Sequence, residues 1–482
     1  MGVMKLDVLG LNTLDIISDA VKYIKEYQGI SIDVDKIEPN DPKVFGVYAK
    51  GETSGVFQME SPGMRKLAQA MHVSSFDDIV ALVALYRPGP LDSGMTQQYV
   101  DGKNGDTIEY PNEAMRKNTG NTFGVIVYQE QLIKVSMDMC GWDLGQADLL
   151  RKIVGRKEVT KIAEITQDFI RDAVAHGETQ EVAEKVAEQV KAAGRYLFNR
   201  SHAVSYGMVS YITAYLKTYY PKEYLCAILN SKDDQEKSLP YIKELKRLKI
   251  PVLPPDLSVG NRKWTLESDG IRMGLEYIKG VGKNLKTEHV DTFESVVSTN
   301  TKTCVIPCIK AGALDYLGES RASLLAKFAT TQDSLKRVQQ CQEKIQQYSG
   351  DPKKQKLLEQ WQEKLKEAQE ITLVTPEKYD KAAGEYEVLS ICFQKLPKVK
   401  TGEITSINKI VDKNGRDMAF VIFKTPYGNF RCTVFADGWQ KVSKVAVGKT
   451  YKFVVNDKGI LEELQMDGKV VKVNERKYKK NF

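Results

Sequence analysis

Near the start of the chain stands the sequence Lys5-Leu6-Asp7-Val8-Leu9-Gly10-Leu11, in which a lone carboxylate lies within an alternating apolar run that stops at a glycine. Such alternation is typical of a half-buried strand, and a glycine is a common place for a strand to end. Lys5 and Asp7 are two residues apart, so on a strand their side chains point to the same face. We therefore expect Asp7 at the end of a strand, with Lys5 beside it.

The composition is that of an ordinary soluble globular protein. Hydrophobic residues make up 42% and charged residues 28% of the 482 residues, which is typical of a folded protein in water. No apolar run is long enough to cross a bilayer, and the first residues lack the layout of a signal peptide. A chain of this length exceeds one hydrophobic core and predicts about three or four domains. We expect a cytoplasmic, multidomain protein with no membrane partner.

The net charge bears on nucleic-acid binding, and the positions of the cysteines bear on metal binding. The net charge of +7 permits nucleic-acid binding through phosphate neutralisation but does not establish it. The seven cysteines are scattered, and only Cys304 and Cys308 are close together. No second pair or histidine is near enough in sequence to complete a zinc site with them. We interpret the thiols as reduced.

The residues that follow the opening strand predict a helix over 12–28. Apolar side chains recur there at Leu14, Ile17, Val21 and Ile24, and Gly29 suits the end of a helix. The next segment, Ile32-Asp33-Val34-Asp35, has the alternation of a strand, which would place both carboxylates on one face where they can share a divalent cation. The lysine and the turn residues after it favour a simple surface turn instead.

Arg87 lies where a helix must stop. A helix expected from about Phe76 to Tyr86 runs into Arg87-Pro88-Gly89-Pro90-Leu91, and two prolines around a glycine cannot continue it. Arg87 is either a cation that stabilises the last carbonyls of the helix or a phosphate ligand. The motif alone favours neither interpretation.

A cationic cluster follows the sequence Tyr128-Gln129-Glu130-Gln131. Arg151, Lys152, Arg156 and Lys157 place four cations within seven residues, at spacings that bring pairs of them to one side of a helix. A solvated helix end is one interpretation. The glycine within the cluster and the apolar run before it favour phosphate binding.

A further helix begins in Phe198-Asn199-Arg200-Ser201-His202-Ala203-Val204-Ser205-Tyr206. Tyrosines recur along it, and such a stripe is more often half-buried core than a platform for bases. Arg200, His202 and Tyr206 differ, because they lie at the N-terminal end, where backbone amides favour an anion. These three residues are therefore candidates for holding a triphosphate beside a flat base.

The segment Gly274-Leu275-Glu276-Tyr277-Ile278-Lys279-Gly280-Val281-Gly282-Lys283 predicts a helix–hairpin–helix. Its two glycines let the backbone approach a phosphate, and such a motif binds duplex DNA without reading its sequence. The candidate DNA-binding residues here are Lys279, Gly280, Gly282 and Lys283.

The last part of the chain predicts two further modules. Residues 331–371 keep a three-four apolar rhythm that is broken near Ser349-Gly350-Asp351-Pro352, which indicates a coiled-coil hairpin of two antiparallel helices. From about Val399 the period becomes that of strands, and about five strands suit a small barrel of the oligonucleotide-binding type. Barrels of this size also bind proteins. For single-strand binding, stacking rings and a cation would come from Phe423, Tyr427, Phe430 and Arg431.

Taken together and in order, the quoted motifs resemble the bacterial replicative DNA polymerase III alpha subunit of the DnaE type, a C-family polymerase. The match rests on the motif around Asp7, on Gly55-Val56-Phe57-Gln58-Met59-Glu60-Ser61, on Leu85-Tyr86-Arg87-Pro88-Gly89-Pro90-Leu91, and on the motifs at 128–131, 150–152 and 198–202. It covers nearly the whole chain. A barrel placed after the helix–hairpin–helix is also similar to the DnaE arrangement.

The resemblance implies a multidomain α+β chain. We expect the end of a nucleotidyltransferase-type palm at 1–30, mainly α-helical fingers at 31–250, the helix–hairpin–helix domain at 251–330, the helical hairpin at 331–371, a linker at 372–398 and an OB-type barrel at 399–482. The reaction implied is template-directed DNA synthesis, in which two Mg²⁺ ions activate the primer hydroxyl and neutralise the triphosphate. Asp7 matches the third of three metal-binding aspartates, and Lys5 resembles a phosphate contact. The fingers motifs carry the residues that would grip the nucleotide: Arg87, Arg151, Lys152, Arg200, His202 and Tyr206.

The chain departs from the family pattern in one large respect. The other two aspartates form an Asp-x-Asp pair upstream of the Asp7 motif, after a histidinol-phosphatase-like (PHP) domain, and neither is in this sequence. Asp33 and Asp35 are not that pair, because they follow Asp7. One carboxylate cannot hold two metal ions. The implied partners are primer–template DNA, deoxynucleoside triphosphates and an N-terminal fragment with the PHP domain and upstream palm. The sliding clamp and other replisome subunits would join them, although no convincing clamp-binding peptide follows the helix–hairpin–helix.

Two hypotheses follow. In the first, the chain is the C-terminal half of a split polymerase, inactive alone and active when another polypeptide supplies the Asp-x-Asp strand. In the second, it is a polymerase-derived DNA-binding accessory protein without synthesis of its own. The presence of Asp7, Lys5 and the basic fingers cluster favours the first hypothesis.

Overall fold

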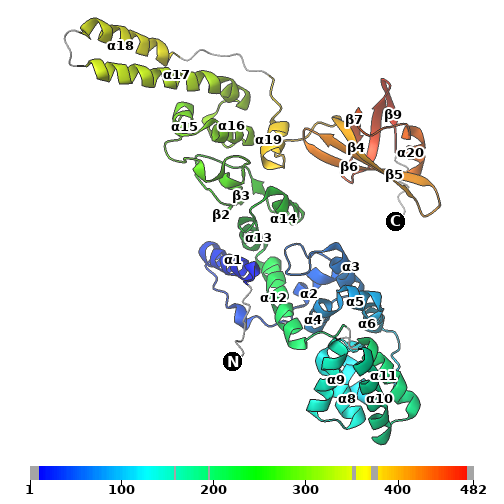
Figure 1. The fold of residues 1–482 in the computed structure, drawn as a ribbon. Coiled ribbons are helices and arrows are strands. Elements are labelled where there is room, and N and C mark those ends of the chain that lie inside the picture. The colour runs from blue at the N-terminus through cyan, green and yellow to red at the C-terminus, as the bar shows by residue number, and fades with distance from the viewer. Residues whose placement is uncertain (1–9, 157–158, 194–195, 350–353, 371–377, 475–482) are drawn as a thin grey trace. The chain divides into compact units, whose positions relative to one another are not determined.

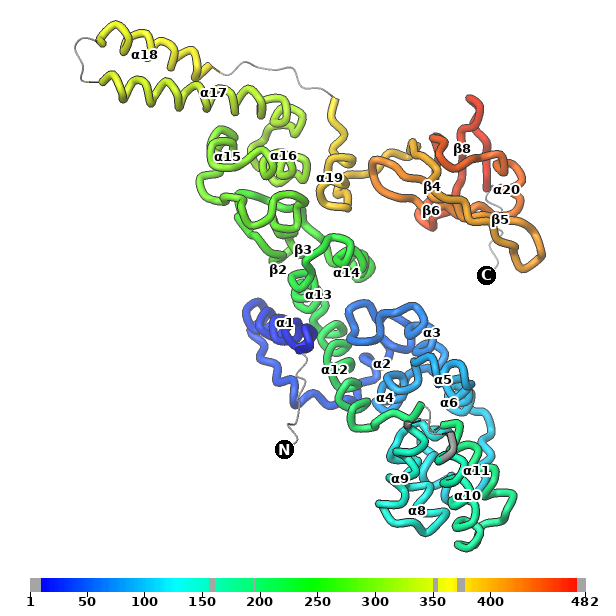
Figure 2. The backbone as a smooth tube through the Cα atoms, viewed as in Figure 1, coloured from blue at the N-terminus to red at the C-terminus, as the bar shows by residue number. Residues whose placement is uncertain are grey.

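A computed structural model describes residues 10–156, 159–193, 196–349, 354–370 and 378–474 of the chain (Figures 1 and 2). Helices and strands are both present, as expected for an α+β chain. The chain forms two compact units, one of residues 1–231 and 240–250 and the other of residues 232–239 and 251–482. The expected strand with Lys5 and Asp7 lies outside the described residues. The finer domain boundaries expected from the sequence stay predictions.

The first unit is almost wholly helical. Helix α14 (Gln235–Arg247) begins in the second unit and ends in the first. The other elements of the first unit are α1 (Asn12–Gln28), η1 (Val34–Lys36), α2 (Pro42–Ala49), α3 (Pro62–Ala70), α4 (Phe76–Leu85), α5 (Pro88–Asp92), α6 (Met95–Lys103), α7 (Glu113–Thr119), η2 (Gly120–Thr122), α8 (Gln129–Cys140), α9 (Leu144–Arg156), α10 (Val159–Ala175), α11 (Gln180–Ala193), α12 (Arg200–Tyr219) and α13 (Pro221–Asn230).

Helix α1 confirms the helix expected over 12–28. Gly29 ends it in the left-handed conformation, with φ of 70°, and donates its N–H to the Lys25 carbonyl. The segment with Asp33 and Asp35 forms a surface turn and not a strand, as its turn residues favour. The Asp33 carboxylate accepts the N–H of Asp35 and starts the short 3₁₀ helix η1, because a local side-chain cap competes with extended structure in so short a segment.

Two hydrophobic clusters among the described residues of the first unit bear on the site, and we call them the first and the second core. One contains α4 and the helices against it, with α12 crossing α2 and α4 (Figure 1). The other is built from α7 to α11. The segment 125–128 serves both cores, because Val125 and Val127 point into the first and Ile126 into the second. This alternation is what an extended segment between two apolar layers requires.

The second unit begins with a small sheet and ends with a large one. Strands β1, β3 and β2 form the small sheet, in that order. The elements up to the large sheet are β1 (Val252–Leu253), β2 (Thr265–Glu267), β3 (Gly270–Arg272), η3 (Leu275–Tyr277), η4 (Gly282–Asn284), α15 (Phe293–Thr299), α16 (Lys302–Ala311), η5 (Asp315–Leu317), α17 (Arg321–Tyr348), α18 (Gln355–Gln369) and α19 (Lys381–Leu389).

Helices α17 and α18 lie where the helical hairpin is expected. They pack against each other side by side (Figure 2), and the Ser334 hydroxyl donates to the Ala368 carbonyl at 2.5 Å. Helix α17 starts at Arg321, ten residues before the expected boundary. A buried ion pair holds that start: the Arg321 guanidinium contacts the Glu385 carboxylate of α19 at 2.8 Å. A buried charge of this kind needs such a partner.

The large sheet has six antiparallel strands rather than about five. Its order is β6-β5-β4-β7-β8-β9, and a parallel bridge between Thr433 and Ile460 joins β6 to the start of β8. Helix α20 lies between β6 and β7 in the chain. The bounds are β4 (Lys400–Val411), β5 (Asp417–Thr425), β6 (Gly428–Val434), α20 (Ala436–Val442), β7 (Thr450–Val455), β8 (Leu461–Met466) and β9 (Lys469–Lys472).

Among the described residues, no helix combines the length and apolar character needed to span a membrane.

Candidate phosphate-binding site

Phe198 joins the starts of two helices in the first unit. Its N–H donates to the Val127 carbonyl at 3.1 Å, and its own carbonyl accepts the N–H of Gln129 at 2.9 Å. Helix α8 begins at Gln129 and α12 two residues after Phe198. The side chain of Asn199 caps α12 by accepting the N–H of His202 at 2.9 Å. This short backbone pairing therefore brings the residues of two distant sequence motifs together.

Arg87 lies over the ring of Phe198. The guanidinium carbon is 3.9 Å from the ring centroid, which is the geometry of a cation–π contact. Partial burial lowers the pKa of Arg87 from its ordinary value, but a guanidinium remains charged at neutral pH. Among the described residues, no carboxylate lies within ion-pair distance of it. Arg87 is thus a positive charge without an anionic partner in this part of the structure.

The turn that carries Arg87 depends on a close approach of backbone to an aromatic ring. Helix α4 ends at Leu85, and Pro88 starts the short helix α5 with Arg87 as its N-cap. A Cβ atom on Gly89 would lie 2.0 Å from the ring of Tyr196, so only glycine fits there. The proline stop expected from the sequence is confirmed.

Arg200 and His202 lie in the first turn of α12, and Tyr206 lies about one turn further on. The His202 ring is 4.2 Å from the Tyr206 ring and 5.4 Å from the Phe198 ring. The Tyr206 ring in turn contacts Phe57 at 5.5 Å. The four rings form a row, which we call the aromatic row: Phe198, His202, Tyr206 and Phe57. The guanidinium of Arg200 is held near the start of this row by Asp77 at 3.4 Å.

The first backbone N–H of α12 has no partner within the helix, but it already has an acceptor elsewhere. The N–H of Arg200 donates to both carboxylate oxygens of Glu130, at 3.2 and 3.1 Å. The anion-binding amide expected from the sequence is therefore occupied by the protein's own carboxylate, and a phosphate would have to rely on the side chains around it.

Arg151 and Lys152 share one carboxylate. Both contact Asp148 at 2.7 Å. Their hydrogen bonds hold the pKa of the Asp148 carboxyl below its ordinary value, with the larger effect from Lys152 and the smaller from Arg151. Arg151 also approaches the side-chain oxygen of Gln129 at 3.5 Å, which links it to the segment beside Phe198. The charge of this pair is partly neutralised. The other two cations of the cluster lie where side chains are not described.

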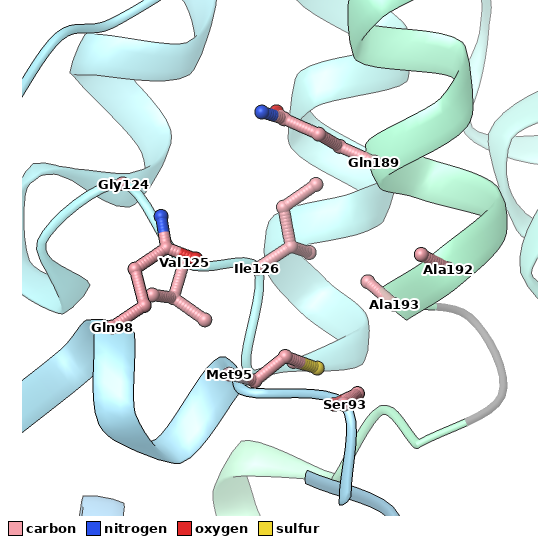
Figure 3. A pocket seen from close by; sticks show the side chains of 9 residues that line it. All are labelled: Ser93, Met95, Gln98, Gly124, Val125, Ile126, Gln189, Ala192 and Ala193. Atoms are coloured by element: carbon pink, nitrogen blue, oxygen red, sulfur yellow. The ribbon is translucent and has the colours of Figure 1, made fainter.

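A cavity in the first unit is separate from these cations. It is about 170 Å³ in volume and lies between α6, the segment 124–126 and α11 (Figure 3). The Gln189 oxygen is buried there without a hydrogen-bond partner among the described residues. Typical ligand pockets measure roughly 300 Å³ or more, so this cavity is too small for a nucleotide. Its lining consists of Ser93, Met95, Gln98, Gly124, Val125, Ile126, Gln189, Ala192 and Ala193.

The expected helix–hairpin–helix segment in the second unit forms an exposed turn between η3 and η4. Gly280 and Gly282 have φ of 88° and 55°, the left-handed region that favours glycine. Apolar anchors on either side of the turn are buried, while Lys279 and Lys283 are exposed. Neither ammonium lies within ion-pair distance of a carboxylate among the described residues. The backbone N–H of Lys279, however, is used by the Val388 carbonyl at 2.9 Å.

One of the expected stacking residues of the large sheet is buried. Phe423 has no exposed surface, and its ring stacks on Phe453 with centroids 4.1 Å apart. The prediction that it stacks on a base is corrected, because no face of its ring is open. Phe430 is half-buried on the same inner side, and the Tyr427 hydroxyl donates to Asp380 at 2.7 Å.

The outer face of this sheet carries an aromatic residue that the sequence analysis missed. Strand β5 points Phe420 and Ile422 outward, since they alternate with the buried Val421 and Phe423. The exposed Arg431 lies over Phe420, with its guanidinium carbon 4.3 Å from the ring centroid. Lys424 is exposed and lies on the same side of β5 as Phe420 and Ile422, so this charged residue in the sequence indicates which face is open to solvent.

The predicted catalytic residue and metal ligand, Asp7, lies outside the described residues, as does Lys5. Among the residues that the structure describes, no group of three His, Cys, Asp or Glu side chains is placed to hold a metal ion. The described part of the chain therefore supplies cations and rings, and no metal site is built from it.

Comparison with known proteins shows which family this sequence is similar to. The model of the "Bacterial DNA polymerase III alpha subunit finger domain" matches residues 13–177. The chain is 35% identical to the DNA polymerase III subunit alpha of Aquifex aeolicus over 86% of its own length. It is 32% identical to that of Campylobacter jejuni over 93% of its length, and 33% identical to that of Halalkalibacterium halodurans over 97%.

The chain spans 38%, 41% and 44% of the length of these three relatives, respectively. The matched finger domain contains Arg87, Arg151 and Lys152, and the longer alignments cover most of both units. Over the part that it spans, this chain belongs to the family of bacterial DNA polymerase III alpha subunits.

Proposed function

We propose that the chain is the fingers and DNA-binding part of a replicative DNA polymerase and that its first unit binds the triphosphate of the incoming nucleotide. The observation that carries this proposal is Arg87, a guanidinium with no anionic partner among the described residues, placed on Phe198 beside Arg200 and His202. Charge-assisted hydrogen bonds from guanidinium groups are the usual way to hold phosphate oxygens.

Each site residue has a distinct part in this proposal. Arg87 and Arg200 bind phosphate oxygens, and Arg200 exchanges its weak, exposed contact with Asp77 for a phosphate. His202 and Tyr206 offer ring faces and polar edges to the sugar and base. Arg151 and Lys152 add positive potential, which is reduced by the Asp148 carboxylate that they share.

The metal chemistry of the reaction needs groups beyond the described residues. We propose that Asp7 is one of three carboxylates that bind two Mg²⁺ ions, with Lys5 as a phosphate contact. The Asp-x-Asp pair would come from a polypeptide that carries the upstream palm. When bound, Mg²⁺ activates the primer hydroxyl and neutralises the leaving pyrophosphate.

The second unit is proposed to hold the DNA. Lys279, Gly280, Gly282 and Lys283 form a helix–hairpin–helix contact to the duplex backbone, where lysines without a carboxylate partner among the described residues neutralise phosphates. The large sheet is proposed to be an OB-type barrel. Its order supports this, because the first strand pairs with the second and fourth, and a parallel bridge joins the third to the fifth.

Within that barrel, single-stranded DNA would stack on the outer face. Phe420 and Arg431 supply a ring and a cation there, and Tyr427 lies in the turn between β5 and β6, whereas Phe430 belongs to the inner side of the sheet. The residue pairs Ile422 with Arg431 and Phe420 with Thr433 are direct neighbours across β5 and β6, so the face presents contiguous apolar and polar groups to a strand of bases.

Primer extension tests the proposal. We expect no nucleotide incorporation by this chain alone, and incorporation when a fragment with the PHP domain and upstream palm is added. Asp7→Ala should abolish the reconstituted activity while binding of the primer–template is retained. If no companion fragment restores synthesis although the chain binds DNA, the second candidate, a DNA-binding accessory protein, is correct.

A further inference from the structure

Three consecutive side chains at the start of α8 connect three separate parts of the first unit. Gln129 contacts Arg151 of α9, Glu130 contacts the start of α12, and Gln131 contacts the backbone beside Phe198. We call Gln129, Glu130 and Gln131 the α8 junction. The first two of these connections span a large separation in sequence, so they do not arise from local helix geometry.

Gln131 fixes the segment on which Phe198 rests. It is only 7% exposed, and its side-chain oxygen accepts the N–H groups of Val127 and Tyr128 at 2.9 and 3.0 Å. Its amide nitrogen donates to the hydroxyl of Thr122 at 2.8 Å. These hydrogen bonds use both the oxygen and the amide nitrogen of the Gln131 side chain, so they hold the segment that pairs with Phe198 in one defined position.

Glu130 fixes the start of α12. One carboxylate oxygen accepts both the side-chain amide of Asn199 at 3.1 Å and the N–H of Arg200 at 3.2 Å. The other oxygen also accepts the N–H of Arg200, at 3.1 Å. A carboxylate at this end of a helix is favoured by the helix dipole. Its negative charge lies next to the two residues that cap and begin α12.

This arrangement has two consequences for an anion bound nearby. First, the positions of Arg200 and His202 relative to Arg87 depend on the contact between Glu130 and α12. Second, the charge of Glu130 opposes a phosphate that approaches the N-terminal amides of α12, and leaves the guanidinium groups of Arg87 and Arg200 as the favoured ligands.

We propose that Glu130 is a positioning residue of the triphosphate site, which holds the N-terminus of α12 and keeps the phosphates on the side of the guanidinium groups. This inference rests on the proposed function of the first unit. It adds a negatively charged residue to the site. Removal of its charge strengthens phosphate binding, whereas truncation of its side chain impairs the placement of α12.

Two substitutions separate the charge of Glu130 from its bridging contacts. Glu130→Gln keeps the oxygen that accepts from Asn199 and Arg200 but removes the charge. Glu130→Ala removes both. The matched control is Glu181→Gln, since Glu181 is also a carboxylate in the first turn of a helix, α11, and has the same relation to its helix dipole.

The measurements are calorimetric titration of the full chain with inorganic triphosphate and steady-state incorporation by the reconstituted polymerase. With Glu130→Gln we expect on the order of threefold tighter triphosphate binding, a lower KM and a nearly unchanged kcat. With Glu130→Ala we expect kcat to fall at least tenfold, while thermal unfolding shows an intact fold. Glu181→Gln should behave as the wild type.

The two proposals fail in different ways. If the wild-type chain binds no triphosphate and Arg87→Ala changes nothing, the proposed function itself is wrong. If Arg87→Ala abolishes binding but both Glu130 variants match the wild type in affinity, KM and kcat, Glu130 is not a positioning residue. A kcat loss in Glu130→Ala that accompanies a lowered melting temperature and is equally large in Glu130→Gln would also overturn the inference.

Discussion

The guanidinium carbon of Arg87 lies 3.9 Å from the centroid of the Phe198 ring, although more than a hundred residues separate the two in sequence. The ring orients the cation without neutralising it, so the positive charge stays available to a ligand. Arg87→Ala should weaken binding of inorganic triphosphate to the full chain by about tenfold, the effect of losing one charge-assisted hydrogen bond.

Calorimetric titration measures this loss. The control is Arg116→Ala, because Arg116 is an exposed arginine that already pairs with Glu113 at 2.5 Å and lies away from Phe198. Equal affinities for Arg87→Ala and Arg116→Ala would show that Arg87 does not bind phosphate.

A second prediction concerns the two phenylalanines of β5. Phe423→Ala should destabilise the second unit by about 3–5 kcal/mol, because it removes a fully buried ring. Phe420→Ala should leave the melting temperature nearly unchanged and weaken binding of single-stranded oligonucleotides by about 1–3 kcal/mol.

Thermal unfolding and fluorescence anisotropy with a labelled oligonucleotide distinguish the two variants, and each serves as the control for the other. Unaltered oligonucleotide affinity in Phe420→Ala would exclude this face as the binding surface.

The lysines of the proposed helix–hairpin–helix turn give a third prediction. The double variant Lys279→Ala/Lys283→Ala should weaken binding of duplex DNA and reduce the slope of log affinity against log salt by about two, one for each phosphate that a lysine no longer neutralises. The measurement is anisotropy over a range of salt concentrations. The exposed Lys185 of α11 provides a control, since Lys185→Ala should leave the slope unchanged.

A buried ion pair in the first unit gives a fourth prediction. Lys217 is 4% exposed, contacts Glu244 at 2.6 Å and donates to the Ser54 carbonyl at 2.7 Å. Burial lowers the pKa of Lys217. Lys217→Met leaves the Glu244 carboxylate buried with one remaining cationic partner among the described residues. The substitution should therefore cost about 3–5 kcal/mol of unfolding free energy.

Chemical denaturation measures this cost. Lys191→Met removes the exposed partner of Glu188 and should cost less than about 1 kcal/mol. A similar small cost for Lys217→Met would mean that the buried pair contributes little.

The last prediction is a pH dependence in the second unit. The hydrogen bond to Asp380 raises the pKa of Tyr427 to about 12, above its ordinary value near 10 in an unfolded chain. A raised folded pKa contributes stability that is complete below about pH 10 and is lost as the pH rises towards 12. Denaturation between about pH 9 and 11 should therefore show falling stability, and Asp380→Asn should reduce the fall that is due to Tyr427. A slope that is identical in both proteins would contradict the assignment.

Long, regular helices could be predicted from the sequence alone. Asn12–Gln28 was anticipated at both ends, because its apolar spacing and the glycine after it are local signals. The same reasoning placed the end of α4 at the proline pair. At Asp33 the alternation alone would indicate a strand, but the turn residues after it correctly favour a surface turn, which the Asp33 side chain caps.

The site was only partly predictable. Grouping Arg200, His202 and Tyr206 followed from helical spacing, whereas the position of Arg87 over Phe198 depends on tertiary packing. Phe423 was misplaced because residues 419–423 are all apolar, so their alternation does not show which face is buried. Glu130 lies within the motif at 128–131, but the sequence assigns it no role, because its partners on α12 are about seventy residues away.

Residues 125–127 alternate between the two cores that carry the cations. Arg151 is carried by α9 and the second core, whereas Arg87 and the start of α12 belong to the first. The extended segment that both cores share also pairs with Phe198. A small rotation of one core about this segment would therefore change the distance between Arg151 and Arg87. Substitutions deep in the packing of α8 to α11 would then alter the proposed triphosphate site without contacting it.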